Sequence, residues 1–425
     1  MKKLYFSGLY SRQTFLIVGT LLLPVSPLLC VLLYFGAALV SGLKWKQVIF
    51  KRERLVILGS IAFLCLGIIS RKVKAENFLP GAVALSDYIP FLLFFFLISL
   101  KPFSKLEIEG FCYALIATIP QQFIIAIFES NLNGRFYFFN EKMPIFDLYF
   151  VPSFVRASAG FFNPNIFACY CVFCGVVALG LLIYELEKIK LYTQKESFIY
   201  LRILVVFIGL ILCIKLLLWS GSDAGIITFF VTSLILLGWI TGKFVYLAIS
   251  SFTCAVFLLI ASKAFPILIS VSQSFTERVP FYNCAIQLIE EKPFMGWGIG
   301  TFASECSART GQPMAHAHNI VLQLGTDIGI IFTILFLGFV GYLLFVCFSF
   351  FLGKRLRKRL KYSLYVAFFM VAISTGVMQF FDLALLMSYR LNFLFWICLA
   401  IPYSLISQSK CLALRSHSKS LHHPA

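Results

Sequence analysis

The sequence predicts an all-α polytopic membrane protein with about 12 transmembrane helices. First, 60% of the 425 residues are hydrophobic and 13% are charged, and the mean hydropathy is +0.92. A soluble chain of this length could not keep so much apolar surface out of water. Second, apolar residues form runs of about 20, which span a hydrocarbon core at ~1.5 Å per residue. Third, basic residues gather in the short segments between these runs.

We expect one transmembrane domain over residues 1–425, without a soluble domain or an internal repeat. Pro24 and Pro27 interrupt the first apolar run, which fits either one kinked helix or a tight hairpin. No small-residue cleavage site follows the basic N-terminus, so this run is predicted as an uncleaved span and not a signal peptide. The predicted spans are residues 14–26, 28–43, 54–70, 78–100, 110–129, 160–184, 199–219, 224–242, 244–262, 318–350, 362–381 and 384–407.

Loop charge predicts the orientation of the chain. Residues 44–54 and 354–361 form two basic clusters, separated by an even number of predicted spans, so they share a side. The positive-inside rule makes this side cytoplasmic, and a hairpin at 14–43 also keeps the basic N-terminus there. We therefore expect both termini in the cytoplasm and the protein in the inner (plasma) membrane. Residues 130–159 and 263–317 then lie outside, and a loop as long as 263–317 is typically functional.

Charge and cysteine content exclude several functions. The net charge of +18 does not indicate nucleic-acid binding, because no basic domain carries it and loop cations serve orientation and lipid headgroups. Cys171 and Cys174 lie within an apolar run, where buried thiols behave as small hydrophobes. Cys284 and Cys306 stand in the long loop, and they could form a disulfide in an oxidising compartment. No cofactor is predicted.

The loop 263–317 has internal organisation. Pro280 fits the first turn of a short helix, and apolar residues then recur at helical spacing until Pro293. Arg278 lies just before this predicted helix. Gly296, Gly298 and Gly300 follow it, and glycine lets the backbone approach a ligand or another segment closely. They do not follow a strand, which argues against a dinucleotide fingerprint.

His316-Ala317-His318-Asn319 lies where the loop re-enters the membrane. Polar groups at a membrane mouth are costly unless they face water or a partner. An imidazole with a pKa near 6.5 can act as a general base. Alternatively, His318 and Asn319 cap the following helix and face water. A metal site is a third interpretation, but no Cys or carboxylate close in sequence completes a ligand set, so no metal is predicted.

Arginines on the predicted outer side suggest a phosphate-bearing ligand. Arg156, Arg278 and Arg309 lie in or near the outer segments. A guanidinium stays charged and binds phosphate oxygens bidentately, which suits a phosphate-bearing lipid approached from the outer leaflet. Contact with solvent or with lipid headgroups is the alternative role for each of them.

Three segments resemble the O-antigen ligase and O-antigen polymerase-like superfamily, between about residues 150 and 345. The first runs from Arg156 through Gly160 to Asn163-Pro164-Asn165. The second runs from Arg278 through Pro293-Phe-Met-Gly296-Trp-Gly298 to Phe302. The third is His316-Ala317-His318-Asn319, then nine intervening residues and Gly329, before a long span. The order and spacing of these motifs are similar to those of the superfamily but do not separate ligase from polymerase.

The resemblance implies a metal-independent glycosyltransferase of cell-surface polysaccharide or lipopolysaccharide biosynthesis in the cell envelope. Such enzymes move a glycan from a polyprenyl-diphosphate carrier to an acceptor hydroxyl of a glycan or lipid on the periplasmic face. By resemblance, His318 activates the acceptor, and Arg278 and Arg156 bind the carrier diphosphate. The remaining motif residues support the loops: His316, Asn319, Gly296, Gly298, Gly300, Asn163 and Asn165. The oligomeric state is not predicted.

The chain departs from the superfamily pattern in one span. Many members carry a Ser-Arg pair there, whereas this chain has Ser220-Gly221-Ser222-Asp223, without arginine. Arg156, Lys215 or another cation then substitutes, or the donor differs, or activity is altered. Phe332 also stands where the ligase pattern has Gly, Thr or Tyr. Three functions stay open: glycan transfer as ligase or polymerase, a transporter or flippase of lipid-linked glycan or a small anion, and a non-catalytic scaffold.

Overall fold

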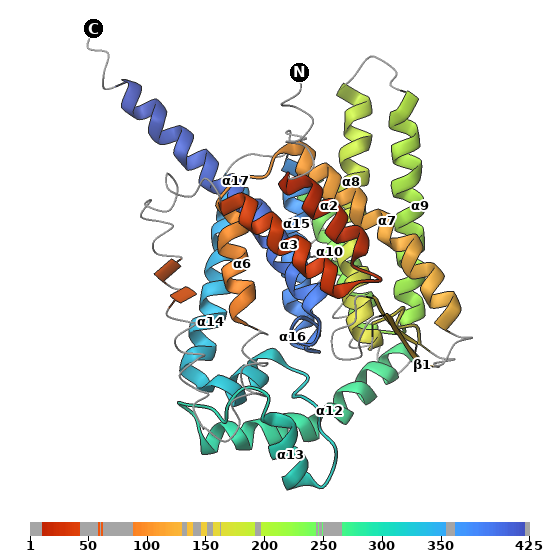
Figure 1. Cartoon of the computed structure of the whole chain (residues 1–425), viewed down its shortest axis with the longest axis vertical. Helices are drawn as coiled ribbons and strands as arrows, with labels where there is room; N and C mark the ends of the chain where they lie inside the picture. The colour runs from red at the N-terminus through yellow and green to blue at the C-terminus, as the bar shows by residue number, and fades with distance from the viewer. Residues whose placement is uncertain are drawn as a thin grey trace.

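Helices account for most of the chain in the computed structural model (Figure 1). The structure describes residues 11–42, 58–59, 61–62, 88–129, 134–138, 146–150, 156–161, 163–191, 197–243, 245, 249, 266–353 and 362–420. The elements are α2 (Arg12–Leu22), α3 (Pro27–Gly42), α6 (Ile89–Ser99), α7 (Lys105–Glu129), β1 (Gly134–Phe138), β2 (Phe146–Phe150), α8 (Pro164–Leu191), α9 (Ser197–Ser220), α10 (Asp223–Thr241), α12 (Pro266–Glu291), α13 (Phe302–Thr310), α14 (Ile320–Gly353), α15 (Ser363–Met378), α16 (Ala384–Met387) and α17 (Tyr389–Ser420).

The membrane class is supported, but the predicted number of about 12 spans is not confirmed. Among the described residues, six helices are long and apolar enough to cross a membrane: Lys105–Glu129, Pro164–Ile189, Phe198–Ser220, Asp223–Thr241, Ile320–Leu352 and Tyr389–Ile406. Three shorter apolar helices are Pro27–Ser41, Ile89–Ser99 and Ser363–Met378. Most of the predicted spans 54–70 and 244–262 lies outside the described residues.

The described residues are helical, as predicted, apart from one short hairpin in the segment 130–159. Strands β1 and β2 pair antiparallel, with Gly134 opposite Phe150 and Phe138 opposite Phe146. Both strands are rich in aromatic residues, which favour extended backbone over helix. A small hairpin therefore lies within the region predicted only as a loop.

The first apolar run forms a helical hairpin and not a single kinked helix. The Thr20 and Tyr34 hydroxyl oxygens lie 2.9 Å apart, and a Cβ on Gly19 would be 3.1 Å from the Tyr34 ring. Glycine therefore permits the close packing of α2 on α3. Helix α2 has 11 residues, about 16 Å at 1.5 Å per residue, so it is shorter than a hydrocarbon core.

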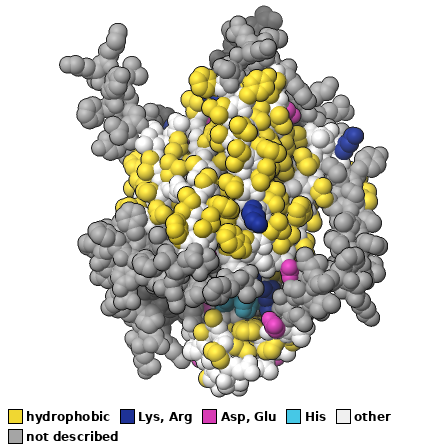
Figure 2. Space-filling model, turned by 90° about the vertical axis from the view of Figure 1, so that its right-hand side faces the viewer, with side chains coloured by type: hydrophobic (Ala, Val, Ile, Leu, Met, Phe, Trp, Pro, Cys, Tyr) yellow, Lys and Arg dark blue, Asp and Glu magenta, His cyan; other side chains and the backbone are white. Residues whose placement is uncertain are grey.

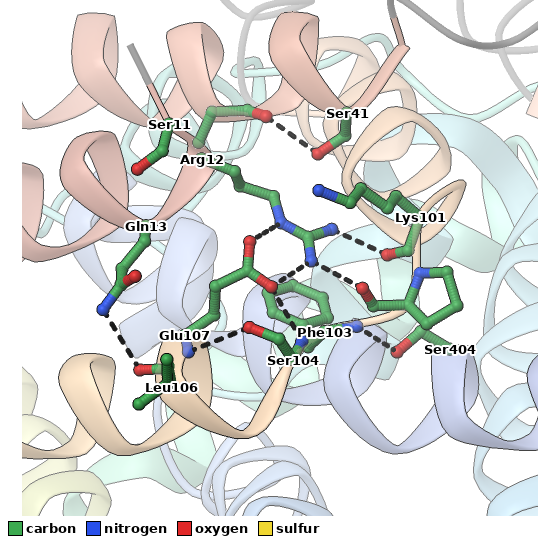
Figure 3. Close-up of polar contacts among 12 residues, drawn as sticks. Ser11, Arg12, Gln13, Ser41, Lys101, Phe103, Ser104, Leu106, Glu107 and Ser404 are labelled. Atoms are coloured by element: carbon green, nitrogen blue, oxygen red, sulfur yellow. Dashed lines mark hydrogen bonds and ion pairs between the residues drawn. The ribbon is translucent and has the colours of Figure 1, made fainter. Parts of the chain in front are cut away.

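A buried ion pair fastens this hairpin to the rest of the bundle (Figure 3). Arg12 Nε donates to Glu107 Oε1 at 2.8 Å, and Arg12 Nη2 donates to Glu107 Oε2 at 2.7 Å. The carbonyl oxygens of Lys101 and Pro102 accept two further bonds, at 2.6 and 2.7 Å. The Phe103 ring lies 4.1 Å from the guanidinium carbon. We call Arg12 and Glu107 the hairpin ion pair.

Helix α8 forms the centre of the bundle, against α9, α10 and α15. Gly180 packs so closely on Ala367 of α15 that no Cβ would fit. Cys171 and Cys174 are buried in this helix. By contrast, α9 and α14 expose many apolar side chains, and Figure 2 shows a broad hydrophobic surface above a narrow band of histidine, basic and acidic side chains. Such a surface fits contact with lipid.

Helices α12 and α13 lie at the end of the bundle opposite to the start of α2 and the end of α17 (Figure 1). A disulfide joins Cys284 of α12 to Cys306 of α13, beside a small apolar core that includes Leu288 and Phe302. Helix α12 begins at Pro266 and contains Pro280, so the prediction of a helix that begins at Pro280 is wrong. Arg278 therefore lies on this helix and not before it.

The glycine-rich segment after α12 docks on the first third of α14. Trp297 N donates to Thr326 O at 2.7 Å, and Gly298 N donates to Asp327 O at 3.1 Å. A Cβ on Gly296 would lie 2.7 Å from the Asp327 backbone. Helix α14 has non-helical backbone angles at Gly329. Gly296 and Gly298 thus approach another segment of the chain closely, which is one of the two roles predicted for the glycines.

Candidate functional site

The His-Ala-His segment leads directly into α14. Asn319 caps that helix, because its Oδ1 accepts from Val321 N at 2.9 Å and Leu322 N at 3.2 Å. Its Nδ2 donates to Phe380 O at 3.2 Å. His318 has a φ of 49°, a left-handed conformation that costs free energy in a non-glycine residue. Asn319 is therefore the cap, and surrounding contacts hold His318 in a strained position.

Asp382 brings the two histidines together from a distant part of the chain. It lies between α15 and α16 and is 6% exposed. Its Oδ1 lies 3.4 Å from His316 Nε2 and 3.5 Å from His318 Nδ1, and the imidazole rings are 4.1 Å apart. We call His316, His318 and Asp382 the His–Asp cluster.

The charge of Asp382 is stabilised despite its burial. Burial raises the pKa of this carboxyl, but the facing imidazoles of His316 and His318 lower it, so the pKa lies well below its usual range. Leu383 N also donates to Oδ1 at 2.8 Å, and Asn165 Nδ2 donates to Oδ2 at 2.8 Å. Asp382 is thus a fixed anion at neutral pH.

Sequence reasoning missed Asp382. It is distant in sequence from both histidines and stands in the short connection between the predicted spans 362–381 and 384–407. A carboxylate among apolar residues is itself a functional signal, because a charged group there needs a partner. That signal indicates a polar site at this position without indicating which residues complete it.

Arg156 joins the His–Asp cluster through Asn165. Its Nη2 donates to Asn165 Oδ1 at 2.7 Å, and its Nε donates to Ser220 O at 2.8 Å. A Cβ on Gly221, whose φ is 59°, would be 3.2 Å from the Arg156 side chain. The guanidinium therefore lies against the segment that lacks the arginine of the superfamily pattern. Lys215, the other candidate substitute, is exposed on α9.

Arg278 approaches the same region from α12. It lies beside Tyr282, where burial raises the pKa of the phenol and a hydrogen bond and charge from Arg278 lower it. The charges of Arg278, Asp223 and Asp382 all act on Arg156, although burial has the largest effect and lowers the pKa of that guanidinium. Two arginines thus converge near Asp382.

The structure places the other predicted residues in supporting or separate positions. Asn163 accepts from Asn165 N at 2.7 Å at the start of α8. Gly296, Gly298 and Gly300 all have positive φ and belong to the turn docked on α14. Arg309 forms an ion pair with Glu291 and stacks on Trp297 at 5.0 Å, so it is engaged away from the His–Asp cluster.

An apolar cavity of about 310 Å³ adjoins the His–Asp cluster. Helices α6, α14, α15 and α17 contribute to its wall, which includes Tyr88, Val340, Gly341, Gly376 and Trp396. Ile320, Gln379 and Phe380 also line it, and these residues lie close in sequence to Asn319 and Asp382. Its size and lining fit part of an apolar chain or a small apolar ligand.

The fold and the site define a helical membrane protein with two arginines, two histidines and an aspartate at one end of its bundle. A family model described as O-antigen ligase matches residues 208–337. The match supports an O-antigen ligase-like family and confirms the resemblance indicated by the sequence motifs. No curated protein matches the chain. The matched segment contains Arg278 and the His-Ala-His segment, whereas Arg156, Asn165 and Asp382 join the site only through the fold.

Proposed function

We propose that this protein transfers a glycan from a polyprenyl-diphosphate carrier to the hydroxyl of a glycan or lipid acceptor. One observation carries this proposal: a buried His–Asp pair lies beside two converging arginines at one end of an apolar bundle. The pair supplies a base for a hydroxyl, and the arginines supply positive charge for a diphosphate. The O-antigen ligase match supports the same reaction class.

His318 is the base in the proposed reaction. Its Nδ1 faces the Asp382 carboxylate at 3.5 Å, which favours the tautomer with the proton on Nδ1. The lone pair on Nε2 is then free to accept the proton of the acceptor hydroxyl. Asp382 positions the imidazole and stabilises the imidazolium that forms. The strained backbone of His318 fits a side chain held in a fixed direction.

Arg156 and Arg278 serve the donor in the proposed reaction. The acceptor oxygen forms a bond to the anomeric carbon of the glycan as the bond from that carbon to the diphosphate oxygen breaks. The diphosphate leaves with the electron pair of the broken bond, and guanidinium groups neutralise its charge. Arg156 substitutes for the missing superfamily arginine in this proposal, and its hydrogen bond to Ser220 O supports that role. The resemblance implies that this chemistry needs no metal.

We propose that the reaction takes place on the periplasmic face of the membrane, and the disulfide supports this proposal. Disulfides persist in oxidising compartments such as the periplasm, so Cys284–Cys306 supports a periplasmic position for α12, α13 and the site. The start of α2 and the end of α17 are then cytoplasmic, because they lie at the opposite end of the bundle. The apolar cavity adjoining the site is proposed to hold part of the hydrocarbon chain of a lipid substrate.

The test is reconstitution in liposomes with a polyprenyl-diphosphate glycan and candidate glycan or lipid acceptors. Wild-type protein is expected to form a covalent product that depends on donor and acceptor, and His318→Ala and Arg278→Ala are expected to lose it. Wild-type rates in both variants would contradict the mechanism. Carrier-dependent uptake without a covalent product would replace the proposal by a transporter or flippase. Extension of carrier-linked repeats in place of attachment to a different acceptor would assign a polymerase.

A further inference from the structure

His316 has no role in the proposed reaction, yet it is 9% exposed and faces Asp382. Neither of its ring nitrogens has a hydrogen-bond partner among the described residues, and the same is true of His318 Nδ1. Buried imidazole nitrogens normally have a partner, since an unsatisfied polar atom costs free energy. Two of these three nitrogens, His316 Nε2 and His318 Nδ1, face one carboxylate, that of Asp382.

The positions of these atoms fit a single metal ion. At a Zn–ligand distance of ~2.1 Å, neighbouring ligands of a tetrahedral site lie ~3.4 Å apart. The Asp382 Oδ1 atom lies 3.4 Å from His316 Nε2 and 3.5 Å from His318 Nδ1. One ligand atom from each of the three residues can be chosen so that all lie within 4.8 Å of one another.

Neighbouring residues hold the three candidate ligands in place, as neighbouring residues do in known metal sites. Ligating carboxylates are usually fixed by further hydrogen bonds, and Asn165 and the Leu383 amide both donate to Asp382. Arg156 holds Asn165 in turn, at 2.7 Å. The Phe281 ring meets the His318 ring edge to face at 5.1 Å. The two histidines and the carboxylate are thus held from α8, α12 and the loop before α16.

We propose that His316 Nε2, His318 Nδ1 and Asp382 Oδ1 bind a zinc ion, with the fourth position open to water. Two imidazoles and one carboxylate suit zinc, whereas calcium and magnesium prefer oxygen ligands. The sequence interpretation rejected a metal because no third ligand was close in sequence, and Asp382 supplies that ligand through the fold.

Zinc at this site switches off the proposed base, a consequence that rests on the proposed function. A neutral imidazole has one N–H group and one nitrogen lone pair. Zinc on Nδ1 of His318 uses that lone pair, so Nε2 carries the proton and cannot accept another. The same ion neutralises the Asp382 charge that would stabilise the imidazolium. The zinc-bound protein is therefore inactive in transfer until the metal is removed.

Zinc binding is tested on the purified full-length protein in detergent. Every protein in the test carries His417→Ala, His422→Ala and His423→Ala, which removes the C-terminal histidines as competing ligands. Calorimetric titration with zinc chloride is expected to show one site. His316→Ala and Asp382→Asn are each expected to weaken it at least ~10-fold, and Glu291→Gln, an exposed carboxylate in an ion pair, is the matched control. No stoichiometric binding, or equal affinity in all variants, would overturn the site.

Cobalt provides a second measurement that does not depend on the folding of a variant. Cobalt(II) bound by nitrogen and oxygen ligands in a tetrahedral site absorbs visible light more strongly than the hydrated ion. The unsubstituted cluster is expected to show this absorption and to lose it when zinc is added. Cobalt with the spectrum of the hydrated ion at all protein concentrations would contradict the site.

The consequence for transfer is tested separately in liposomes. Zinc is expected to suppress transfer by the wild-type cluster, and a chelator is expected to restore it. The residual transfer of His316→Ala is expected to be insensitive to the same zinc concentration. Zinc binding with undiminished transfer would overturn the inhibition and keep the site. Absence of transfer in metal-free protein would overturn the proposed function, and the calorimetric result would still decide the site.

Discussion

The hairpin ion pair and the His–Asp cluster are two buried charged sites at opposite ends of one apolar bundle, but only one has unused bonding capacity. The Arg12 guanidinium makes four hydrogen bonds, and both Glu107 oxygens are engaged. In the His–Asp cluster, the imidazole nitrogens facing Asp382 have no hydrogen-bond partner within the described structure. Burial of charge alone therefore does not identify a reactive site. Buried nitrogen atoms without a hydrogen-bond partner, next to several charged side chains, do identify one.

The difference follows from local sequence. Ser104 and Glu107 form a capping box, with Glu107 N donating to Ser104 Oγ at 3.2 Å and Ser104 N donating to Glu107 Oε2 at 2.7 Å. Helix formation at the start of α7 thus fixes the partner of Arg12. No helix cap fixes the histidine rings in this way, because Asn319 takes that role before α14. The imidazoles are consequently available for chemistry.

The largest expected effect is on transfer in Asp382→Asn. The neutral amide no longer stabilises a protonated His318 or favours its Nδ1–H tautomer, so the transfer rate is expected to fall about 10²- to 10⁴-fold. The apparent affinity for the donor is expected to change far less, because Arg156 and Arg278 stay in place. Glycan-transfer kinetics in liposomes measure both quantities. Glu291→Gln is the matched control. An equal loss of transfer rate in Glu291→Gln would mean that Asp382→Asn acts through general destabilisation of the protein.

The next effect is on stability, in Arg12→Ala. This change leaves Glu107 buried without its partner and is expected to lower the free energy of unfolding by about 3–5 kcal/mol. The double variant Arg12→Met with Glu107→Leu removes both charges and is expected to recover most of that loss. Denaturant titration of the detergent-solubilised protein measures each value. A double variant as unstable as Arg12→Ala would contradict the explanation that the loss comes from an unpaired buried charge.

The disulfide is expected to contribute somewhat less to stability than the hairpin ion pair. Cys284 and Cys306 are 22 residues apart, and closing a loop of that size stabilises by about 3 kcal/mol in the chain-entropy model. Replacing both cysteines with serine is expected to increase proteolysis between α12 and α13 before it affects α8. Mass spectrometry of timed digests locates the cuts. Equal protection of this region in the wild type and the variant would contradict that contribution.

Filling the cavity is expected to weaken substrate binding moderately. Gly341 and Gly376 line the cavity, and a Cβ added at either glycine meets no atom within 4 Å. Gly376→Leu is expected to raise the KM for a lipid substrate about 10-fold, since a few buried methylenes at ~0.8 kcal/mol each give that factor. Gly338→Leu is the control, because its Cβ is also unobstructed but Gly338 does not line the cavity. Equal effects at both positions would contradict a role for the cavity.

The smallest expected effect is the pH dependence of stability that Asp382 contributes. Its folded pKa is lowered by the histidines, so the ionised carboxyl stabilises the protein above its unfolded pKa of about 3.9, and this contribution is lost as pH falls through the folded pKa. Stability is therefore expected to decrease below about pH 4, with a smaller decrease in Asp382→Asn. Unfolding titrations from about pH 6 to pH 3 measure the two slopes. Identical slopes would contradict this titration.

The sequence predicted the membrane class, the family resemblance and the N-terminal hairpin, because runs of apolar residues and short motifs are local signals. It missed Asp382 because that residue meets His316 and His318 only through the tertiary packing of α15, α16 and the loop before α14. It placed a helix start at Pro280, since proline fits a first turn, whereas α12 continues through that proline. The sequence also predicted a loop at residues 130–159, where β1 and β2 form a hairpin.

The most direct measurement is the rate of glycan transfer per folded protein for variants at the two ends of the bundle. His318→Ala and Arg278→Ala are compared in liposomes with the charge-free double variant Arg12→Met with Glu107→Leu. The account predicts a loss of at least ~100-fold in each of the first two and a rate within about threefold of wild type in the double variant. Wild-type rates in His318→Ala and Arg278→Ala would contradict the account.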